Sequence, residues 1–394
     1  MPLSNQFKQF LAQTSLQPLG LEVVRAEDIY LFDCYGKTYM DLISGISVSN
    51  LGHHHPVVIT AIRQQLEQYL QTMVYGEYIQ APQVQLAEYL TGLLPSTLEQ
   101  VYLVNSGSEA IEGAMKLAKR YTGRYNILAF KNAYHGSSHG ALSLMDSEYY
   151  TSAFRPLLPN IYFLDYNQPD QLLLLDESFA AVVVEPVQAE AGVRPGSSSF
   201  LNRLRKRCTE TGTLLIFDEI QTGMGRTGTL YNFQQLDLIP DILVTAKALG
   251  AGMPLGAFIS SAQIMHSLRQ NPVLGHITTF GGHPLSCAAA LAGLKFIHES
   301  KLLSQIPEKA QLFVQLLKHP LIKEIRQAGF LMALDLHKAD LVEKVVMLCK
   351  ERGLLVDWFL HHRESIRLAP PLIINTLQIK QACEVIRSVL DDLI

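Results

Sequence analysis

Reactive side chains follow directly after three short apolar runs of the sequence. The run VYLVN leads to a Ser-Gly-Ser segment that contains Gly107 and Ser108. The runs TLLIF and DILVTA lead to Asp218 and Lys247. Open α/β sheets bind their ligands at the carboxyl ends of the strands, so we expect these residues around one cleft. That cleft would hold free backbone N–H groups, a carboxylate and an amine.

These groups together fit one cofactor, pyridoxal phosphate. A Gly-Ser pair at a helix N-terminus suits a phosphate, while a lysine can form the Schiff base and a carboxylate can pair with the pyridine nitrogen. Burial among Ala246, Ala248 and the glycine-rich LGAGMPLG would lower the pKa of Lys247 toward the neutral amine that attacks a carbonyl. Asp218, ionised, would keep the pyridine nitrogen protonated. Tyr134, in NAYHG, is placed to stack on the ring.

A glycine motif lies just beyond Asp218. Gly223, Gly225 and Gly228 form a G-x-G-x-x-G, a spacing that also occurs in dinucleotide-binding turns. Such a turn needs a helix after its third glycine and an acidic residue about 20 positions further on. Asp241 lies at a tolerable distance, but TLYNF follows Gly228 where the helix should begin. A nicotinamide cofactor is therefore disfavoured, and we interpret the glycines as a loop that passes close to other backbone.

The elements that position these residues belong to an α/β pattern. From residue 101 onward, short apolar runs alternate with longer helical patterns. β-Branched runs such as 182–184 predict strands covered on both faces, as in a mainly parallel sheet between helices. Apolar residues from Ala110 to Tyr121 follow the spacing of an amphipathic helix. The predicted strands lie in VYLVN, ILAF, IYFLD, AAVVVE, TLLIFDE, DILVTAK and LGAFISS.

The pattern divides the chain into three parts. Residues 1–50 are expected to form an N-terminal arm that joins the small domain, with a strand-turn-strand corner at Gly36 and Lys37. Residues 51–290 are expected to form the large cofactor-binding domain. Residues 291–394, where helices are punctuated by FLMALDL and GLLVDWF, are expected to form a smaller C-terminal α+β domain.

The composition excludes several classes of protein. Charge is nearly balanced, with 32 Lys and Arg against 36 Asp and Glu, and the basic cluster at 203–207 reads as a solvated helix face, so no nucleic acid is expected. Five cysteines without a C-x-x-C pair argue against a disulfide framework or a structural zinc site. The N-terminus lacks a signal-peptide pattern, and no run reaches the ~18 apolar residues of a membrane span. We expect a cytoplasmic protein without membrane contact.

Together, these motifs resemble the class III (subgroup II) pyridoxal-phosphate aminotransferases, the group that contains acetylornithine, ornithine, 4-aminobutyrate and putrescine aminotransferases. The resemblance implies fold type I, with a mainly parallel seven-stranded sheet sandwiched by helices and a smaller α+β domain. It also implies an obligate homodimer with the cofactor at the interface. The matching segments are GLEVVRAEDIYLFDCYGKTYMDLISGISVSNLGHHHP, NSGSEAIEGAMKLAKRYTG, AYHG, VVVEPVQAEAGV, IFDEIQTGMGRTG, AKALGAGMPLGA, TTFGGHPLSCAAA and IRLAPPL.

The resemblance also implies roles for individual residues around the cofactor. The GHHHP segment falls on a turn of the family, so no metal site is expected there. The implied cofactor contacts are Lys247 for the internal aldimine, Asp218 for the pyridine nitrogen, Gly107 and Ser108 for the phosphate, Tyr134 for the ring face, Gln221 for the phenolic oxygen and Thr279 for the phosphate of the neighbouring subunit.

Two further residues are implied at the substrate. Arg367 would take a substrate carboxylate by a two-point contact, and Glu190 would neutralise Arg367 when an amine without that carboxylate binds. The sequence departs from acetylornithine and ornithine aminotransferases at Ser137 and Ser138, where an arginine for the substrate α-carboxylate is usual. The segments HGALSL and FRPLLPN look more like the corresponding segments of diamine aminotransferases. Arg155, in the second segment, is interpreted as a surface arginine.

The resemblance thus implies a ping-pong transamination from an ω-amine of ornithine, acetylornithine, diamine or 4-aminobutyrate type to 2-oxoglutarate. Lys247 would act as general base and then general acid. Two alternatives stay open. A glutamate-1-semialdehyde aminomutase would share the fold and the lysine but would not need Arg367 and Glu190. A non-catalytic protein on the same scaffold would not need an intact Lys247, Asp218 and Gln221.

Overall fold

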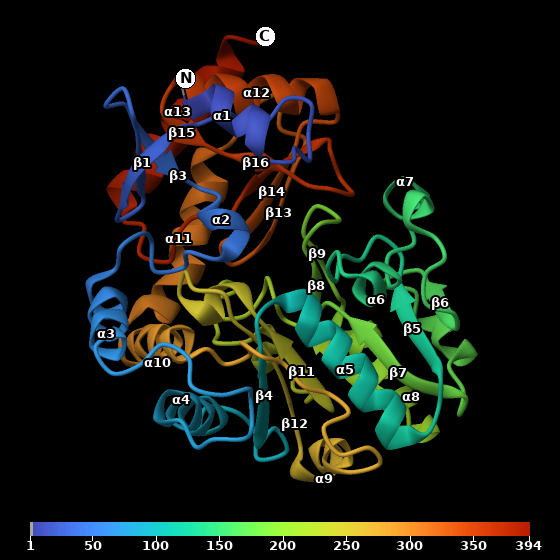
Figure 1. The fold of residues 1–394 in the computed structure, drawn as a ribbon. Helices are drawn as coiled ribbons and strands as arrows, with labels where there is room; N and C mark the ends of the chain where they lie inside the picture. Colours follow the sequence, from blue (N-terminus) through green and yellow to red (C-terminus); the bar gives the residue numbers. More distant parts are fainter. Residues whose placement is uncertain (1–2) are drawn as a thin grey trace.

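The computed structural model describes residues 3–394, and a seven-stranded sheet lies at its centre (Figure 1). The strand order is β4-β12-β11-β10-β7-β5-β6, and β12 runs antiparallel to both of its neighbours while the remaining pairs are parallel. The predicted mainly parallel sheet is therefore confirmed. Its strands are β4 (Gln100–Val104), β5 (Asn126–Phe130), β6 (Ile161–Leu164), β7 (Phe179–Val184), β10 (Leu214–Asp218), β11 (Ile242–Thr245) and β12 (Gly256–Ser260).

Helices cover both faces of this sheet. Helix α5 (Gly107–Thr122) packs on one face, where its apolar residues share a core with Ile127, Val183 and Ile216. Helices α8 (Ser198–Thr211), α4 (Ala81–Thr91) and α10 (Pro284–Glu299) contribute to the core on the other face.

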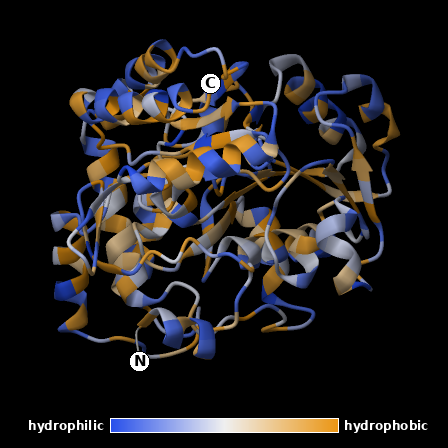
Figure 2. Cartoon of the chain, turned by 90° about the horizontal axis from the view of Figure 1, so that it is seen from above, coloured by the Kyte–Doolittle hydropathy of each residue, from blue (hydrophilic) through white to orange (hydrophobic). Residues whose placement is uncertain are grey.

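The sequence produces these layers because the strands have apolar residues on both faces, while each helix has an apolar side and a polar side. Every residue of β7, β10, β11 and β12 is buried, as expected for strands between two helical layers. The helices around the sheet change between hydrophobic and hydrophilic colours along their turns (Figure 2). This amphipathic pattern leaves one stripe of each helix for the core.

The C-terminal part forms a second, smaller sheet with helices on it, drawn in orange and red at the top of Figure 1. Its strand order is β13-β14-β17-β16, and all pairs are antiparallel. The elements are α11 (Leu302–Leu316), β13 (Glu324–Ala328), β14 (Leu331–Asp335), α12 (Ala339–Glu351), β15 (Leu354–Leu355), β16 (Asp357–Trp358), β17 (Ser365–Leu368) and α13 (Thr376–Asp391).

The N-terminal strands pack with this C-terminal part. Strands β1 (Val23–Glu27), β2 (Tyr30–Asp33) and β3 (Thr38–Asp41) form an antiparallel sheet that β15 extends by pairing with β3. Ile29, Met40 and Leu42 lie in the same apolar cluster as the C-terminal helices. This contact agrees with the expected arm, while the domain boundaries themselves stay a prediction.

The remaining elements are short or peripheral. No helix of the described residues is long and apolar enough to cross a membrane. All five cysteines are free, and four of them are buried. The remaining α-helices and β-strands are α1 (Leu3–Phe10), α2 (Ser44–Ser47), α3 (Pro56–Leu66), α6 (His139–Leu142), α7 (Glu148–Thr151), α9 (Ala262–Met265), β8 (Val187–Gln188) and β9 (Arg194–Pro195). The 3-10 helices are Ser152–Phe154, Pro169–Leu174, Asn232–Gln235, Lys247–Gly250 and His266–Arg269.

Candidate active site

The residues that the sequence places after three strands meet at one cavity. The carboxyl ends of β4, β10 and β11 open onto a cavity of about 150 Å³. Six of the nine predicted site residues line this cavity, and the other three, Glu190, Thr279 and Arg367, do not. The lining consists of Ser106, Gly107, Ser108, Tyr134, His135, Gly136, Glu185, Asp218, Ile220, Gln221 and Lys247.

The start of α5 presents unused backbone donors to this cavity. Ser106 caps the helix: its hydroxyl accepts from Glu109 N at 3.2 Å, and its carbonyl accepts from Ala110 N at 3.1 Å. Within the described residues, no hydrogen bond uses the N–H groups of Gly107 and Ser108. Two free N–H groups at the positive end of a 16-residue helix form a site for an anion such as a phosphate.

A second glycine keeps this end of the helix accessible. Gly136 has a φ of +131°, and a Cβ at this position would lie 2.1 Å from the Ser108 hydroxyl. The loop that follows β5 therefore passes directly over the start of α5, and Ser137 N donates to the Ser108 hydroxyl at 3.2 Å. A side chain at residue 136 would occupy the space expected to hold the phosphate.

The carboxylate of Asp218 is held by a buried histidine. Asp218 Oδ2 lies 2.7 Å from His135 Nδ1, and Asp218 Oδ1 accepts from Ile220 N at 3.0 Å. Burial opposes the charged form of His135, but the hydrogen bond to Asp218 and its charge outweigh that effect and raise the pKa of His135. No role was predicted for His135, which lies in the NAYHG segment.

Lys247 lies directly after β11 and reaches the same cavity. Burial lowers the pKa of Lys247 to about 8, although the nearby charge of Glu190 opposes this shift. The direction is the one that the sequence indicated. A lysine with such a pKa is neutral in about one molecule in ten at pH 7, far more than an ordinary lysine, and the neutral form is the nucleophilic one.

Gln221 connects the cavity to a buried ion pair. Gln221 Nε2 donates to Glu190 Oε1 at 3.0 Å, and Glu190 Oε2 lies 2.5 Å from an Arg367 guanidinium nitrogen and accepts from Leu360 N at 3.0 Å. Burial favours the neutral acid, but Arg367 and the Leu360 amide hold the pKa of Glu190 below its ordinary value. The two residues predicted to act on the substrate are thus in direct contact.

Arg367 keeps unused donors beside this ion pair. Its guanidinium lies 4.6 Å above the ring of Phe359, and the side chain is 2% exposed. Its Nε and its second terminal nitrogen have no partner in the described part of the chain. A buried arginine with one carboxylate partner and two unused nitrogens can accept a second carboxylate.

Tyr134 lines the cavity, and its backbone is fixed by a residue that the sequence analysis missed. Tyr134 N donates to Glu185 Oε2 at 3.2 Å, and the other oxygen of Glu185 accepts from Ala189 N at 3.2 Å. Burial raises the pKa of Glu185 to about 8. The position of Glu185 directly after β7, in VVVEP, was the signal that could have identified it.

Three predicted features lie outside the cavity. Ser137 is exposed, with its hydroxyl 3.2 Å from the Tyr134 hydroxyl. Arg155 pairs with Glu148 at the surface, as the sequence suggested. Thr279 lies in an exposed loop, where its carbonyl accepts from Gln71 Nε2 at 2.8 Å. Its predicted role toward a neighbouring subunit stays a prediction.

The glycine motif does not form a dinucleotide-binding turn. No helix begins at Gly228, and the first one that follows is the short 3-10 helix Asn232–Gln235. In the GHHHP segment, His53 pairs with Asp41 at 2.9 Å and His55 packs on Phe296. The described residues contain no group of three or more His, Cys, Asp or Glu side chains that could hold a metal.

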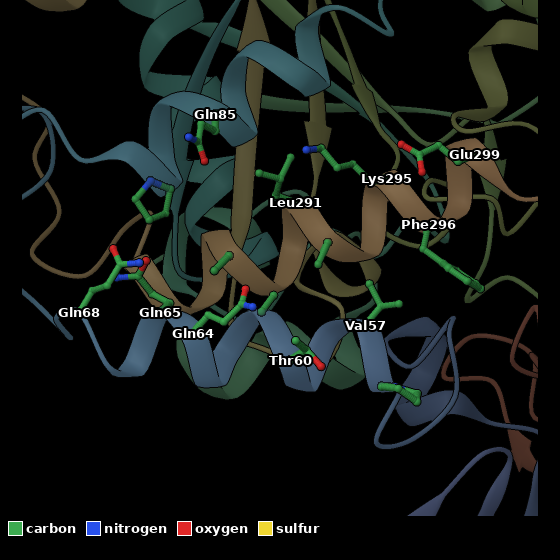
Figure 3. Close-up of a pocket in the computed structure, with 15 residues that line it drawn as sticks. Val57, Thr60, Gln64, Gln65, Gln68, Gln85, Leu291, Lys295, Phe296 and Glu299 are labelled. Carbon is green, nitrogen blue, oxygen red and sulfur yellow. The ribbon is translucent and has the colours of Figure 1, made fainter.

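A larger hollow lies elsewhere, between α3, α4 and α10 (Figure 3). It has a volume of about 690 Å³, and none of the residues around Lys247 takes part in it. Its polar lining side chains include Gln64, Gln68, Gln85 and Lys295, which lie around the hollow in Figure 3. The small cavity at the strand ends, where the reactive groups converge, is therefore the candidate active site.

The α/β architecture and this set of residues define a pyridoxal-phosphate-dependent transaminase of fold type I. Residues 11–390 match the family model of class-III aminotransferases, and the chain belongs to this family. It is 38% identical over 375 residues to the acetylornithine aminotransferase of Methanosarcina mazei, covering 94% of this chain and 91% of that one.

Other relatives carry different names. The chain is 34% identical over 379 residues to the [LysW]-aminoadipate semialdehyde/glutamate semialdehyde transaminase of Sulfolobus acidocaldarius, covering 93% and 94% of the two chains. Among solved structures, the ornithine aminotransferase of Toxoplasma gondii matches with a TM-score of 0.92 and 29% identity, over 99% of this chain and 94% of that one. The family thus includes relatives named for more than one substrate.

Proposed function

We propose that this transaminase moves an amino group from an ω-amine donor to 2-oxoglutarate in a ping-pong reaction. The donor would be of ornithine, acetylornithine, diamine or 4-aminobutyrate type. The observation that carries the proposal is the buried Glu190–Arg367 pair, 2.5 Å apart and joined to the cavity by Gln221. A site that alternates between an amine and a dicarboxylate needs a cation that can be neutralised in one half-reaction and released in the other.

The residues at the strand ends fit pyridoxal phosphate. The free N–H groups of Gly107 and Ser108 would hold the phosphate, and the glycine at 136 leaves room for it. Asp218, fixed by His135, would face the pyridine nitrogen, and the unpaired Oε1 end of the Gln221 amide lies at the cavity beside them. When bound, the cofactor supplies the carbonyl that takes the amino group and a ring that accepts electrons from the substrate.

Lys247 would move the reaction's proton. Its Nζ, with a pKa of about 8, would react as a neutral amine with the carbonyl of the cofactor. It would then remove the proton from the donor carbon that carries the amino group, and return that proton to the cofactor carbon that takes the nitrogen. Tyr134 would cover the ring, because no other Phe, Tyr or Trp side chain is among the described residues that line the cavity. Asp218 would keep its hydrogen bond to His135 throughout.

Glu190 would act as the counter-ion that selects the half-reaction. With an amine bound, Glu190 would remain paired with Arg367, so that no carboxylate is required. With 2-oxoglutarate or glutamate bound, the substrate carboxylate would replace Glu190 and use the two unpaired nitrogens of Arg367. A glutamate-1-semialdehyde aminomutase has no need for this exchange, which favours the transaminase.

The donor class is narrowed by what surrounds Tyr134. Ser137, at the position where the resemblance leads us to expect an arginine, is an exposed neutral residue, and Arg155 is occupied by Glu148. Donors without an α-carboxylate, such as diamines, therefore fit this part of the site better than ornithine or acetylornithine.

A homodimer is the second part of the proposal. The segments around Tyr75 and Thr278 lie side by side, because Tyr75 N donates to Thr278 O at 3.2 Å. Both segments carry exposed apolar side chains, which in larger groups mark interaction surfaces, and a second copy would cover them and bring its Thr279 near the cofactor phosphate. The exposed apolar residues of the two segments are Leu70, Met73, Tyr78, Ile79, Val273, Leu274, Ile277 and Phe280.

A panel of amines tests the proposed reaction. Purified enzyme with added pyridoxal phosphate is incubated with 2-oxoglutarate and each of ornithine, acetylornithine, 1,4-diaminobutane and 4-aminobutyrate, and glutamate formation is measured. We expect glutamate with at least one of these ω-amines, and faster turnover with the diamine than with ornithine. If all four fail while α-amino acids or semialdehydes react, the ω-amine assignment is wrong. Light scattering on the same sample measures the mass and tests the dimer.

A further inference from the structure

The glycine motif after β10 carries a fully buried arginine that the proposed reaction does not use. Arg226 is 0% exposed, and its guanidinium donates to the carbonyls of Phe330, at 3.3 Å, and Pro370, and to Asn50 Oδ1. Its own carbonyl accepts from Phe330 N at 2.9 Å. Burial lowers the pKa of Arg226 to about 9, so the side chain stays charged at neutral pH. Its partners are neutral oxygens and not a carboxylate.

These oxygens come from three separate segments of the chain. Phe330 lies between β13 and β14, Pro370 follows β17, and Asn50 precedes α3. Asn50 closes the arrangement, because its Nδ2 donates to Met224 O at 2.8 Å and its carbonyl accepts from Leu372 N at 2.7 Å. The guanidinium therefore joins the loop after β10 to the N-terminal segment and to the small C-terminal sheet.

The glycines allow this close approach. A Cβ at Gly225, where φ is +91°, would lie 2.6 Å from Leu303 Cδ2 and 2.8 Å from Leu372 Cδ1. A Cβ at Gly329, where φ is +58°, would lie 2.6 Å from Arg226 O. Gly225 of the motif thus allows close packing against the Leu303 and Leu372 side chains, while Gly329 allows the backbone around it to approach the backbone at Arg226.

Two polar connections then link the loop after β10 to the segment around Arg367. One runs from Gln221 through Glu190 to Arg367, and the other runs from Arg226 to Pro370, three residues beyond Arg367. In the proposed function the first connection opens whenever a substrate carboxylate takes the place of Glu190. The second connection contains no group that a substrate displaces.

We infer that Arg226 is a positioning residue that keeps Arg367 at its distance from the Asp218–Gln221 loop while the Glu190–Arg367 pair is open. The inference rests on the proposed exchange of Glu190 for a substrate carboxylate. Loss of the Arg226 contacts should therefore impair the carboxylate-binding state more than the amine-binding state. A purely structural arginine would impair both states alike.

Binding of glutarate, a dicarboxylate without a reactive carbonyl, measures the first state directly. In Arg226→Lys the charge remains, but an ammonium cannot satisfy several oxygens with the fixed planar geometry of a guanidinium. We expect the Kd of glutarate for the holoenzyme, measured by calorimetry, to rise about tenfold, while the Kd of pyridoxal phosphate and the KM of the amine donor change less than about twofold. Asn50→Ala, which removes one acceptor, should produce the same pattern more weakly.

Arg205→Lys is the matched control. Arg205 lies on α8, is hydrogen-bonded to Asp241 at 2.8 Å, and is not among the residues that join the loop after β10 to the small C-terminal sheet. The control variant should leave all three constants unchanged. Equal changes in glutarate and donor constants, or no change in either for both Arg226→Lys and Asn50→Ala, would overturn the inference. Arg367→Ala separates the two proposals: if it leaves glutarate binding intact, the proposed function itself fails and the inference falls with it.

Discussion

The half of the active site at the sheet and the half at β17 hold their charged side chains by different means. At the sheet, Asp218 is the last residue of a buried central strand, and both of its oxygens are bonded within the same layer, to His135 and to Ile220 N. At β17, Arg367 meets Glu190, which comes from the loop after β8, across the junction between the two parts of the fold. We call these the cofactor half and the substrate half.

The difference follows what each half must do. In the proposed function the cofactor half holds one ligand throughout, so it would benefit from groups fixed by neighbouring segments and by glycine-dependent close approach, as at Gly136. In the proposed function the substrate half receives two kinds of substrate in turn, so its pairing would have to be reversible. A buried arginine with one carboxylate and two unused nitrogens is suited to such an exchange. Under this proposal the chain would separate a fixed electrostatic site from one whose ion pair is exchanged.

Lys247→Ala should give the largest effect and act only on the cofactor half. Without the amine that forms the Schiff base and moves the proton, turnover should fall by about ten-thousandfold or more. The cofactor should still bind without covalent attachment, because its proposed phosphate and pyridine contacts remain. Absorbance spectra and amine turnover measure both points, with Lys206→Ala, an exposed lysine on α8, as the control. Normal turnover in Lys247→Ala would show that the catalytic base lies elsewhere.

Arg367→Ala should act on the substrate half and leave the cofactor half intact. Removing the arginine leaves Glu190 buried without its cation and removes the contact for the carboxylate, so the KM for 2-oxoglutarate should rise at least about a hundredfold. Cofactor affinity, measured by fluorescence titration, should change little. If cofactor affinity falls as strongly as acceptor affinity, the two halves are not separable and the comparison fails.

The rate at which the apoenzyme binds the cofactor covalently should depend on pH. This dependence should connect the two halves, because Lys247 of the cofactor half feels the charge of Glu190 in the substrate half. Lys247, with a pKa of about 8, is mainly protonated at pH 7 and mainly neutral at pH 9, so the capture rate should rise about tenfold over this range and then level off. Glu190 opposes the lowering of this pKa, so Glu190→Gln should shift the midpoint toward lower pH. Stopped-flow absorbance measures the rate; a flat profile would contradict the role of neutral Lys247.

The fold was largely predictable because its central strands are continuous apolar runs. The apolar runs of all seven strands, with their boundaries within one or two residues, were visible in the sequence. Helix α5 was predicted to open at the Ser-Gly-Ser-Glu segment ahead of its first apolar residue, Ala110, and it begins there, at Gly107, with Ser106 as its N-cap. Polar helix starts are recognised by their capping residues and not by hydrophobic spacing.

The site residues could be predicted only where the position of a residue in the sequence, such as the end of an apolar run, was enough to indicate its role. Strand-end residues such as Asp218 and Lys247 could be found in this way. Glu185 was missed although it stands directly after β7, because only the strand order shows that β7 lies beside β10 and so near Asp218. His135 was missed because it lies in the loop after β5, several residues beyond the strand end, and the chain order does not show that this loop reaches Asp218. The role of Arg226 likewise depends on contacts more than 100 residues apart in sequence.

Ser137→Arg should give the smallest effect and sharpen the account of the substrate half. A new arginine at this exposed position would sit in a largely solvated setting, so its attraction for a substrate α-carboxylate should be modest. We expect the ratio of kcat/KM for ornithine to that for 1,4-diaminobutane to rise about two- to fivefold, through KM, since only ornithine carries an α-carboxylate. Ser198→Arg, on the exposed start of α8, adds the same charge away from the cavity and should leave the ratio unchanged. A ratio that stays constant in Ser137→Arg would mean that the neutral residue at 137 does not set the preference among donors, and that the selection of amines depends on the Glu190–Arg367 pair alone.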